Sequence, residues 1–383
     1  MIGEHGGVPE RAPRARTARR AATLAVCGGL LLATTVSAGS AAPSPPRDGT
    51  ARATGGAPAA VPTENEPCEA AGLEPTLRPE RTVGEAVRLI RAGGNRTDPG
   101  NRTDPADRTQ RKEPGLTIGV DQNSFLWGYR DPNTAELSGF DIDLAEAIAE
   151  DVLGPSSGEL RLVVLSTSER EAALASGTVD MVVRTMSINC DDVNRSVGED
   201  GRERTEPDVV EFSAPYFTTS QRIVVPQNSE ITGFDSSLNG KRVCSAASSS
   251  ADRLLQELAR EHPWWDEVED EDGPLLPTPP NHLDCLVKIQ LGKADALVTD
   301  EALAAGHLAQ DPTMKIVGEG RQEEYYGIAM HQDDEDLIAW VNAVLAEYLA
   351  GGEESAWEEA YRRNDLALHL GGSVEPPDPV YRD

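Results

Sequence analysis

The sequence predicts an α/β protein of two lobes, in which the second lobe is inserted into the first. Three observations predict this class. Strands alternate with amphipathic helices, the alternation begins anew after about residue 240, and the patterns of the first round resume near the C-terminus. We expect residues 113–220 and 323–383 to form lobe 1 and residues 221–322 to form lobe 2. The chain would cross twice between the lobes, and such a hinge can close around a ligand.

The first round of elements follows from short apolar runs and from helical spacing. Within residues 139–152, Ile142, Ala145 and Ile148 fall on one face of a helix. Gly177 follows the next predicted helix and would end it. The expected elements are strand 116–120, helix 139–152, strand 160–165, helix 168–176 and strand 179–186.

The second round begins with a strand at residues 242–245. A serine run then opens a helix at residues 249–261, because serine hydroxyls accept hydrogen bonds from the first N–H groups of a helix. A strand at residues 326–330 returns the chain to lobe 1. The other expected elements are helix 282–291, strand 294–299 and helices 300–310, 336–350 and 353–362.

The N-terminus has the layout of an export signal. Arginines up to Arg20 precede an apolar stretch over residues 21–33, and small residues follow as far as Ala42. We therefore expect residues 1–42 to be an export signal and the protein to act on the cell-wall side of the membrane. The alternatives are an uncleaved anchor, lipidation at Cys27 and a twin-arginine signal.

Residues 43–112 predict a tether rather than a domain. Their first part is rich in Pro, Ala, Gly and Thr, which is typical of an extended linker. A short helix is expected at about residues 82–92. The polar sequence Asn-Arg-Thr-Asp-Pro then occurs twice between residues 95 and 105, and we interpret it as an exposed insertion.

Composition excludes several function classes. The chain has 383 residues, with 35 basic and 65 acidic side chains and a formal net charge of −30. Nucleic-acid binding needs a basic surface, and an anionic membrane would repel this chain. The sequence also lacks an H-E-x-x-H pair and a P-loop. Its one G-x-S-x-G match, at residues 154–158, lies between a predicted helix and a predicted strand, whereas a nucleophile elbow lies between a strand and a helix. We therefore expect neither an enzyme nor a bound cofactor.

Four cysteines follow the export signal, namely Cys68, Cys190, Cys244 and Cys285. An even number in an exported protein predicts two disulfides, for which three pairings are possible. Zinc binding is the competing interpretation, because His282 and Cys285 have H-x-x-C spacing. A second close-spaced pair is missing from the sequence, so we do not expect a metal site.

Motifs of a known family occur together in the globular part of the chain. They begin at Gly139 (GFDIDL), Gly177 (GTVD), Thr185 (TMSI), Phe212 (FSAPYF), Leu238 (LNGKRV), Ala294 (ADALVTD) and Tyr326 (YGI). In this order they resemble family 3 of the bacterial extracellular solute-binding proteins, the polar amino acid receptors of ABC importers, over about residues 113–370. The resemblance implies a two-lobe periplasmic-binding-protein-like fold of type II, with the ligand in the interlobe cleft. It also implies a Cys244–Cys285 disulfide, which leaves Cys68 for Cys190.

The resemblance also implies a function and partners. The ligand would be a free amino acid, either glutamate or aspartate, or glutamine or asparagine, and the receptor, expected to be a monomer, would deliver it to an ABC transporter permease. Two alternatives stay open. The protein could be a sensor that signals through a membrane protein to a cytoplasmic kinase system, or a dehydratase, since cyclohexadienyl dehydratases resemble the same fold.

Ligand-binding residues follow from the chemistry of an amino acid and from the family's motifs. The ammonium needs a carboxylate, and Asp300 matches the family's residue, with helix capping as its alternative role. Thr185 and Ser187 match the segment that holds the ligand's two charged ends. Arg184 lies at a strand end and would favour an acidic ligand if it faced the cleft.

Further candidates lie at the ends of predicted strands and helices. Asp121 ends the first strand, where such folds gather ligand groups. Phe125 and Trp127 could form a wall of the pocket or pack in the core. Ser249 and Ser250 could bind the ligand's side chain or simply cap the helix that they open.

The chain departs from the family's pattern at the α-carboxylate clamp. Asp192 stands where a gap-free match expects the clamping arginine, and an acidic insertion follows at about residues 196–208. We expect Arg195 to reach back into the site, with Arg202 or Arg204 as alternatives. If none of them does, the α-carboxylate would depend on Arg184 and on backbone donors.

Overall fold

The computed structural model describes residues 75–93, 113–156, 158–188, 210–261, 278–370 and 378–382. The expected export signal, Cys68, Cys190, Arg195, Arg202 and Arg204 all lie outside these residues, so the predictions that concern them stay predictions. Among the described residues, no helix is both long enough and apolar enough to cross a membrane.

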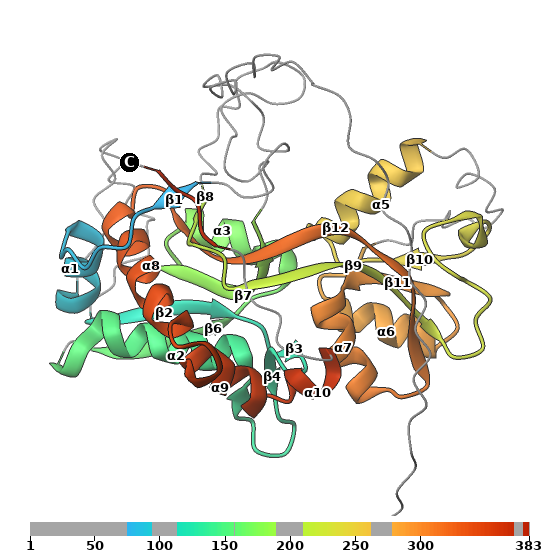
Figure 1. The fold of residues 1–383 in the computed structure, drawn as a ribbon, viewed down its shortest axis with the longest axis horizontal. Coiled ribbons are helices and arrows are strands. Elements are labelled where there is room, and N and C mark those ends of the chain that lie inside the picture. The colour runs from blue at the N-terminus through green and yellow to red at the C-terminus, as the bar shows by residue number, and fades with distance from the viewer. Residues whose placement is uncertain are drawn as a thin grey trace, which may run out of the picture. The chain divides into compact units, whose positions relative to one another are not determined.

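One mixed sheet connects the two rounds of elements. Its strands follow the order β10-β11-β9-β12-β7-β2-β6, and β8 (Val210–Phe212) pairs with β12. The two long strands β9 (Phe217–Pro226) and β12 (Met314–His331) pair antiparallel, with register shifts between Val317 and Glu323. Figure 1 shows them running side by side from β7 toward β10 and β11. Residues 220 and 322, near which the lobe boundaries are expected, lie within β9 and β12, and the boundaries themselves stay a prediction.

The first hydrophobic core forms around the parallel strands β2 (Gly115–Val120), β6 (Glu159–Val164) and β7 (Met181–Ser187). Helices α2 (Phe140–Leu153), α8 (Glu335–Leu349) and α9 (Ala356–Arg363) pack on it through buried side chains such as Ile148 and Trp357. Because α8 and α9 follow β12, residues from both ends of the described chain share this core. The predicted strand and helix positions of the first round are confirmed to within a few residues.

Two further hydrophobic cores lie around β10 (Val243–Cys244) and β11 (Ala296–Asp300). Helices α5 (Ser250–Glu261), α6 (His282–Gln290) and α7 (Glu301–Gln310) contribute to these cores or to the contact with the first core. The Cys244–Cys285 disulfide joins β10 to α6, with an S–S distance of 2.01 Å. A two-lobe α/β arrangement is therefore present, as the sequence predicts.

Several elements were absent from the sequence-based prediction. β9 is the longest of them, and the others include β1 (Thr76–Leu77), which pairs in parallel with β13 (Tyr381–Arg382).

Helix α1 (Glu85–Ala92) is confirmed, and it packs against the first core through Val87 and Ile90. The remaining elements are β3 (Asn123–Ser124), β4 (Gly128–Arg130), β5 (Leu137–Ser138), α3 (Arg170–Ala175) and α10 (Leu366–Leu370).

Candidate ligand-binding site

A pocket lies where the two groups of elements face each other. Its lining comes from the ends of β7 and α3 on one side and from α5, α6 and β11 on the other. The lining residues are Thr167, Arg170, Thr185, Met186, Ser187, Ser249, Ser250, Arg253, His282 and Asp300. A larger and more open hollow beside α2 and β6 is lined from the first core alone, and its charged side chains are Glu146 and Glu150. The pocket lined from both groups of elements is called the cleft below, because side chains from both sides converge in it.

Hydrogen bonds join the two walls of the cleft. The N–H of Thr167 donates to the carbonyl of Pro280 at 3.1 Å. Arg170 donates from Nη2 to the carbonyl of Ser248 at 3.2 Å and from Nε to the carbonyl of Thr167 at 2.9 Å. The described conformation is therefore one in which the walls contact each other.

An acidic cluster occupies one wall. Asp300 ends β11 and is buried, and it accepts hydrogen bonds from Tyr326 at 2.6 Å and from Gln221 at 2.5 Å. Glu324 of β12 accepts from Gln221 at 2.7 Å and from Ser250 at 2.8 Å, and also from the Ser187 hydroxyl. Burial, together with the charge of Glu324, raises the pKa of Asp300 to about 7. A bound cation would relieve this repulsion between the two carboxylates.

Asp300 does not cap the helix that it precedes. It stands at the N-cap position of α7, but its side chain accepts no hydrogen bond from that helix. Its carboxylate instead faces the pocket and the groups of the acidic cluster. The capping alternative is therefore wrong, and the role of Asp300 in binding the ligand ammonium stays a prediction.

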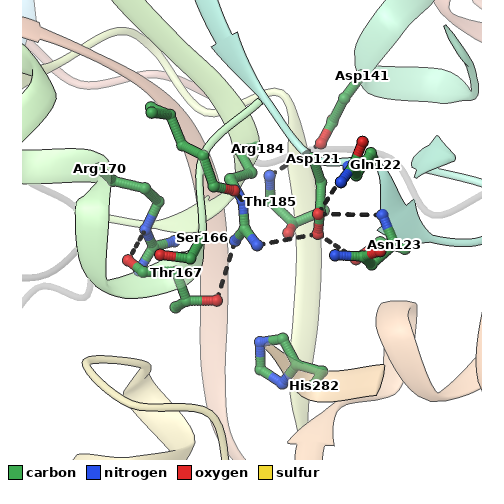
Figure 2. Close-up of polar contacts among 12 residues, drawn as sticks. Asp121, Gln122, Asn123, Asp141, Ser166, Thr167, Arg170, Arg184, Thr185 and His282 are labelled. Carbon is green, nitrogen blue, oxygen red and sulfur yellow. Dashed lines mark hydrogen bonds and ion pairs between the residues drawn. The ribbon is translucent and has the colours of Figure 1, made fainter. Parts of the chain in front are cut away.

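Arg184 and Asp121 form an ion pair and do not line the cleft. Their Nη2 and Oδ2 atoms are 3.0 Å apart, and both side chains are almost fully buried (Figure 2). Arg184 also donates to the Leu165 carbonyl at 2.9 Å and to the Thr167 hydroxyl at 3.1 Å. The expectation that Arg184 faces the ligand is contradicted, because Asp121 compensates its charge within the protein.

Asp121 also accepts hydrogen bonds from the three residues that follow it. It accepts hydrogen bonds from the N–H groups of Gln122 and Asn123, at 2.7 and 3.1 Å, and from the Ser124 hydroxyl at 2.6 Å. These contacts hold the turn after β2. Asp121 is not among the residues that line the cleft, so the structure gives it a structural role rather than the expected polar role at the pocket mouth.

Thr185 and Ser187 both line the cleft, as expected. Thr185 has a positive φ of 41°, which is rare for a β-branched residue, and its N–H donates to Asp141 at 2.9 Å. Asp141 also accepts from Tyr216, and burial raises the pKa of Asp141 to about 7. The buried Asp141 therefore fixes a strained backbone segment at the edge of the pocket.

The two serines at the start of α5 differ in what they bind. Ser249 donates to the Ala246 carbonyl at 2.7 Å and accepts from the N–H of Asp252 at 3.1 Å, which is a capping arrangement. The Ser250 hydroxyl instead contacts Gln221 and Glu324 of the acidic cluster. Both line the cleft, but only Ser250 turns its hydroxyl toward the acidic cluster.

The two aromatic candidates pack elsewhere. Trp127 is fully buried and makes edge contacts with Phe140, Phe217 and Tyr326, while its Nε1 donates to the carbonyl of Ala302 at 2.9 Å. Phe125 packs edge-on against Tyr129. Neither lines the cleft, so the wall role is corrected to one in packing.

The zinc alternative is also wrong. Cys285 forms a disulfide, whereas a zinc ligand is a thiolate. His282 lines the cleft, and its Nδ1 lies 3.2 Å from the Thr299 hydroxyl. Burial lowers the pKa of His282 well below its usual value, so this imidazole is neutral at pH 7.

Comparison with known proteins identifies the fold's family. Residues 116–364 match the model of bacterial extracellular solute-binding proteins, family 3. The chain belongs to this family. A curated relative in the family, the glutamine-binding protein GlnH of a Bacillus subtilis ABC transporter, is 27% identical over 248 residues, covering 65% of this chain and 80% of the relative.

Other members show the same degree of similarity. The glutamate-binding protein GluB of Corynebacterium glutamicum is 26% identical over 247 residues, covering 62% of this chain and 75% of GluB. Among solved structures, an ancestral arginine-binding protein bound to glutamine has a TM-score of 0.52 and 28% identity, covering 65% of this chain and 96% of the other. The type II fold predicted from the family's motifs is thereby confirmed.

Several polar residues at this candidate site were missed in the sequence. Thr167, Arg170, Arg253 and His282 line the cleft, and Glu324 completes the acidic cluster. Glu324 stands two residues before the Tyr-Gly-Ile motif, so its position beside a hinge strand was a usable signal. Arg170 begins the segment Arg-Glu-Ala-Ala-Leu, which precedes the Gly-Thr-Val-Asp motif and agrees with the family's pattern, but no ligand role was assigned to it from the sequence.

Proposed function

We propose that this chain is an exported receptor that closes on a free polar amino acid and delivers it to an ABC importer. The observation that carries the proposal is the charge pattern of the cleft. One wall bears Asp300 beside Glu324, and Arg170 and Arg253 line the same space. An amino acid zwitterion carries both complementary charges, and charge-assisted hydrogen bonds to each end would orient it.

The ligand class is narrowed by relatives and by charge. Relatives are named for binding glutamine and glutamate, and one structural neighbour holds glutamine. Two arginines in the cleft favour a ligand with a second carboxylate, or an amide of the same shape. We therefore propose glutamate, aspartate, glutamine or asparagine, bound with the ammonium at Asp300 and close to Thr185 and Ser187.

Binding without chemical conversion is part of the proposal. The buried His282 is neutral, and its Nδ1 lies within hydrogen-bond distance of the Thr299 hydroxyl. The carboxylates of Asp300 and Glu324 both accept hydrogen bonds from the amide of Gln221. An incubated amino acid, or prephenate, should be recovered unchanged. Turnover of either compound would point to the dehydratase alternative.

Calorimetric titration tests the proposed function. The full chain, freed of bound ligand by reversible unfolding, is titrated with glutamate, aspartate, glutamine, asparagine, arginine and histidine. Dissociation constants in the micromolar range or below, about −8 kcal/mol or better, are expected for one of the first four. A preference for arginine or histidine would support a receptor but overturn the proposed ligand class. No detectable binding of any of the six amino acids would overturn the proposal.

A further inference from the structure

The α-carboxylate of a bound amino acid needs a cationic partner. Of the two arginine positions that could supply it, one does not line the cleft and the other holds a different residue in this chain. Arg184 is committed to Asp121 at 3.0 Å and does not line the cleft. The position at which the family's pattern expects the clamping arginine holds Asp192. The chain therefore lacks the expected guanidinium at its usual place in the sequence.

Arg170 brings a guanidinium into the cleft from a different element. It is the first residue of α3, it is 8% exposed, and it lines the same pocket as Asp300. Figure 2 shows its side chain bonded to Thr167, on the same side of the site as Arg184. The opposite charges of Arg170 and Asp300 would thus meet the two ends of one zwitterion.

The guanidinium of Arg170 is held by two carbonyl groups when the walls contact each other. Its Nε donates to the Thr167 carbonyl at 2.9 Å, and its Nη2 donates to the Ser248 carbonyl at 3.2 Å. A side chain fixed by two carbonyls loses little further conformational freedom on binding. The Ser248 carbonyl belongs to the opposite wall, so the same guanidinium joins both sides of the closed cleft.

Arg253 offers a contrast within the same pocket. It lies on α5 and is partly exposed, and its backbone N–H donates to the carbonyl of Ser249 at 3.2 Å. It belongs to the wall that already carries Asp300 and Ser250. A zwitterion that spans the cleft would place its α-carboxylate toward the wall opposite Asp300, which is where Arg170 stands.

We propose that Arg170 binds the α-carboxylate of the ligand, in place of the arginine that the family's pattern expects after β7. The assignment rests on the proposed function, since it requires an amino acid in the cleft. It also makes ligand binding and closure depend on one residue, because Arg170 bonds to the wall that bears Asp300.

The test compares two ligands on two variants. L-Glutamate and its α-amide differ only in the α-carboxylate, and each is titrated into the full chain, Arg170→Gln and Arg253→Gln. We expect Arg170→Gln to weaken glutamate binding about 30-fold or more and to weaken binding of the α-amide less than about threefold. Arg253→Gln, which removes the same charge from the same pocket, should leave the ratio of the two affinities unchanged.

Three results would overturn the assignment. Equal losses for glutamate and the α-amide in Arg170→Gln would mean that Arg170 only joins the walls. An unchanged glutamate affinity would place the guanidinium away from the ligand. A glutamate-selective loss in Arg195→Gln, but not in Arg170→Gln, would assign the carboxylate to Arg195.

Two further outcomes are also decisive. If the α-amide binds too weakly to measure, Arg170→Lys decides: recovery of part of the lost glutamate affinity supports a charge contact, and no recovery at an unchanged melting temperature contradicts it. If the unmodified chain binds none of the amino acids, the proposed function fails and this assignment falls with it. Normal binding by Arg170→Gln would overturn the assignment alone.

Discussion

Two clusters of buried charge occur in this protein, and they differ in how the charge is balanced. Asp121 and Arg184 are opposite charges, 3.0 Å apart, and three further donors reach Asp121. Asp300 and Glu324 carry the same charge and are bridged by the amide of Gln221. The first cluster is complete within the protein, whereas the second would gain from a cation.

We propose that this difference separates a structural site from the proposed ligand site. A buried ion pair stabilises local geometry but leaves little charge for a ligand. A pair of like charges facing a pocket is costly alone, and that cost falls when a ligand ammonium arrives. Residue type alone would treat Asp121 and Asp300 as equals, since both follow a strand. Their partners assign them different roles.

Breaking the compensated pair should have the largest effect. Arg184→Met leaves the buried charge of Asp121 without its cation, which should lower the free energy of unfolding by about 3–5 kcal/mol. Chemical denaturation measures this loss, and the double variant with Asp121→Asn should recover part of it. A loss below about 0.5 kcal/mol, or a selective loss of glutamate over glutamine binding, would show that Arg184 serves the ligand instead.

Neutralising Asp300 should give the opposite pattern. Asp300→Asn should weaken amino acid binding by about 2–4 kcal/mol, because the ligand ammonium loses its partner. The ligand-free variant should be at least as stable as the unmodified chain at pH 8, because a buried charge beside Glu324 is removed. Calorimetry and denaturation measure the two effects, with Asp295→Asn as a control that leaves binding intact. Intact binding in Asp300→Asn would place the ammonium elsewhere.

The pH dependence of the same residue should run in opposite directions for binding and for stability. The pKa of Asp300 in the folded protein, about 7, lies above the ordinary 3.8, so protonated Asp300 favours the folded state below pH 4, and this contribution is lost as the pH rises through 7. Binding of an ammonium needs the ionised form. Affinity should therefore fall toward tenfold per pH unit below pH 7, while the ligand-free protein gains stability.

Asp141 contributes to the stability slope but not to the binding slope. Burial also raises the pKa of Asp141 to about 7, but its partners are Tyr216 and the backbone of Thr185. Subtracting the stability profile of Asp300→Asn from that of the unmodified chain isolates Asp300. An affinity that is flat between pH 5.5 and 8 would contradict the assigned role of Asp300 in binding.

The fold was predictable where patterns are local. Helix α2 matches its expected range closely because its apolar residues repeat at helical spacing over fourteen positions. The pairing of β1 with β13 was not predictable, since two-residue strands at opposite ends of the chain carry no periodic signal. The hinge strand β9 has alternating burial, but its threonines and serine obscured the alternation of apolar and polar residues.

The site was predictable only as far as strand ends determine it. Asp300, Thr185 and Ser187 were correctly placed at the cleft because each lies at the end of a strand. Arg184 was misassigned because its partner, Asp121, ends a neighbouring parallel strand, and two opposite charges at one sheet edge neutralise each other. Arg170 was missed because its contact with the opposite wall, at the Ser248 carbonyl, is made only in the folded protein. Glu324 was missed because it lies behind the pocket lining, where β12 brings it to Ser187 and Ser250.

The smallest effect is expected from neutralising the second carboxylate of the acidic cluster. In Glu324→Gln, Asp300 loses its like-charged neighbour, so the pKa of Asp300 should fall, and the acid-side loss of affinity should move to lower pH by about one unit or less. Titration calorimetry from pH 5 to 8 measures the midpoint. The matched control is Glu323→Gln, because Glu323 is exposed and bonds only the neighbouring Tyr325 among its described contacts. A midpoint shifted equally by both variants would indicate the general field of this acidic chain. A shift confined to Glu324→Gln would show that the like charge next to Asp300, across the amide of Gln221, sets the pH range of binding.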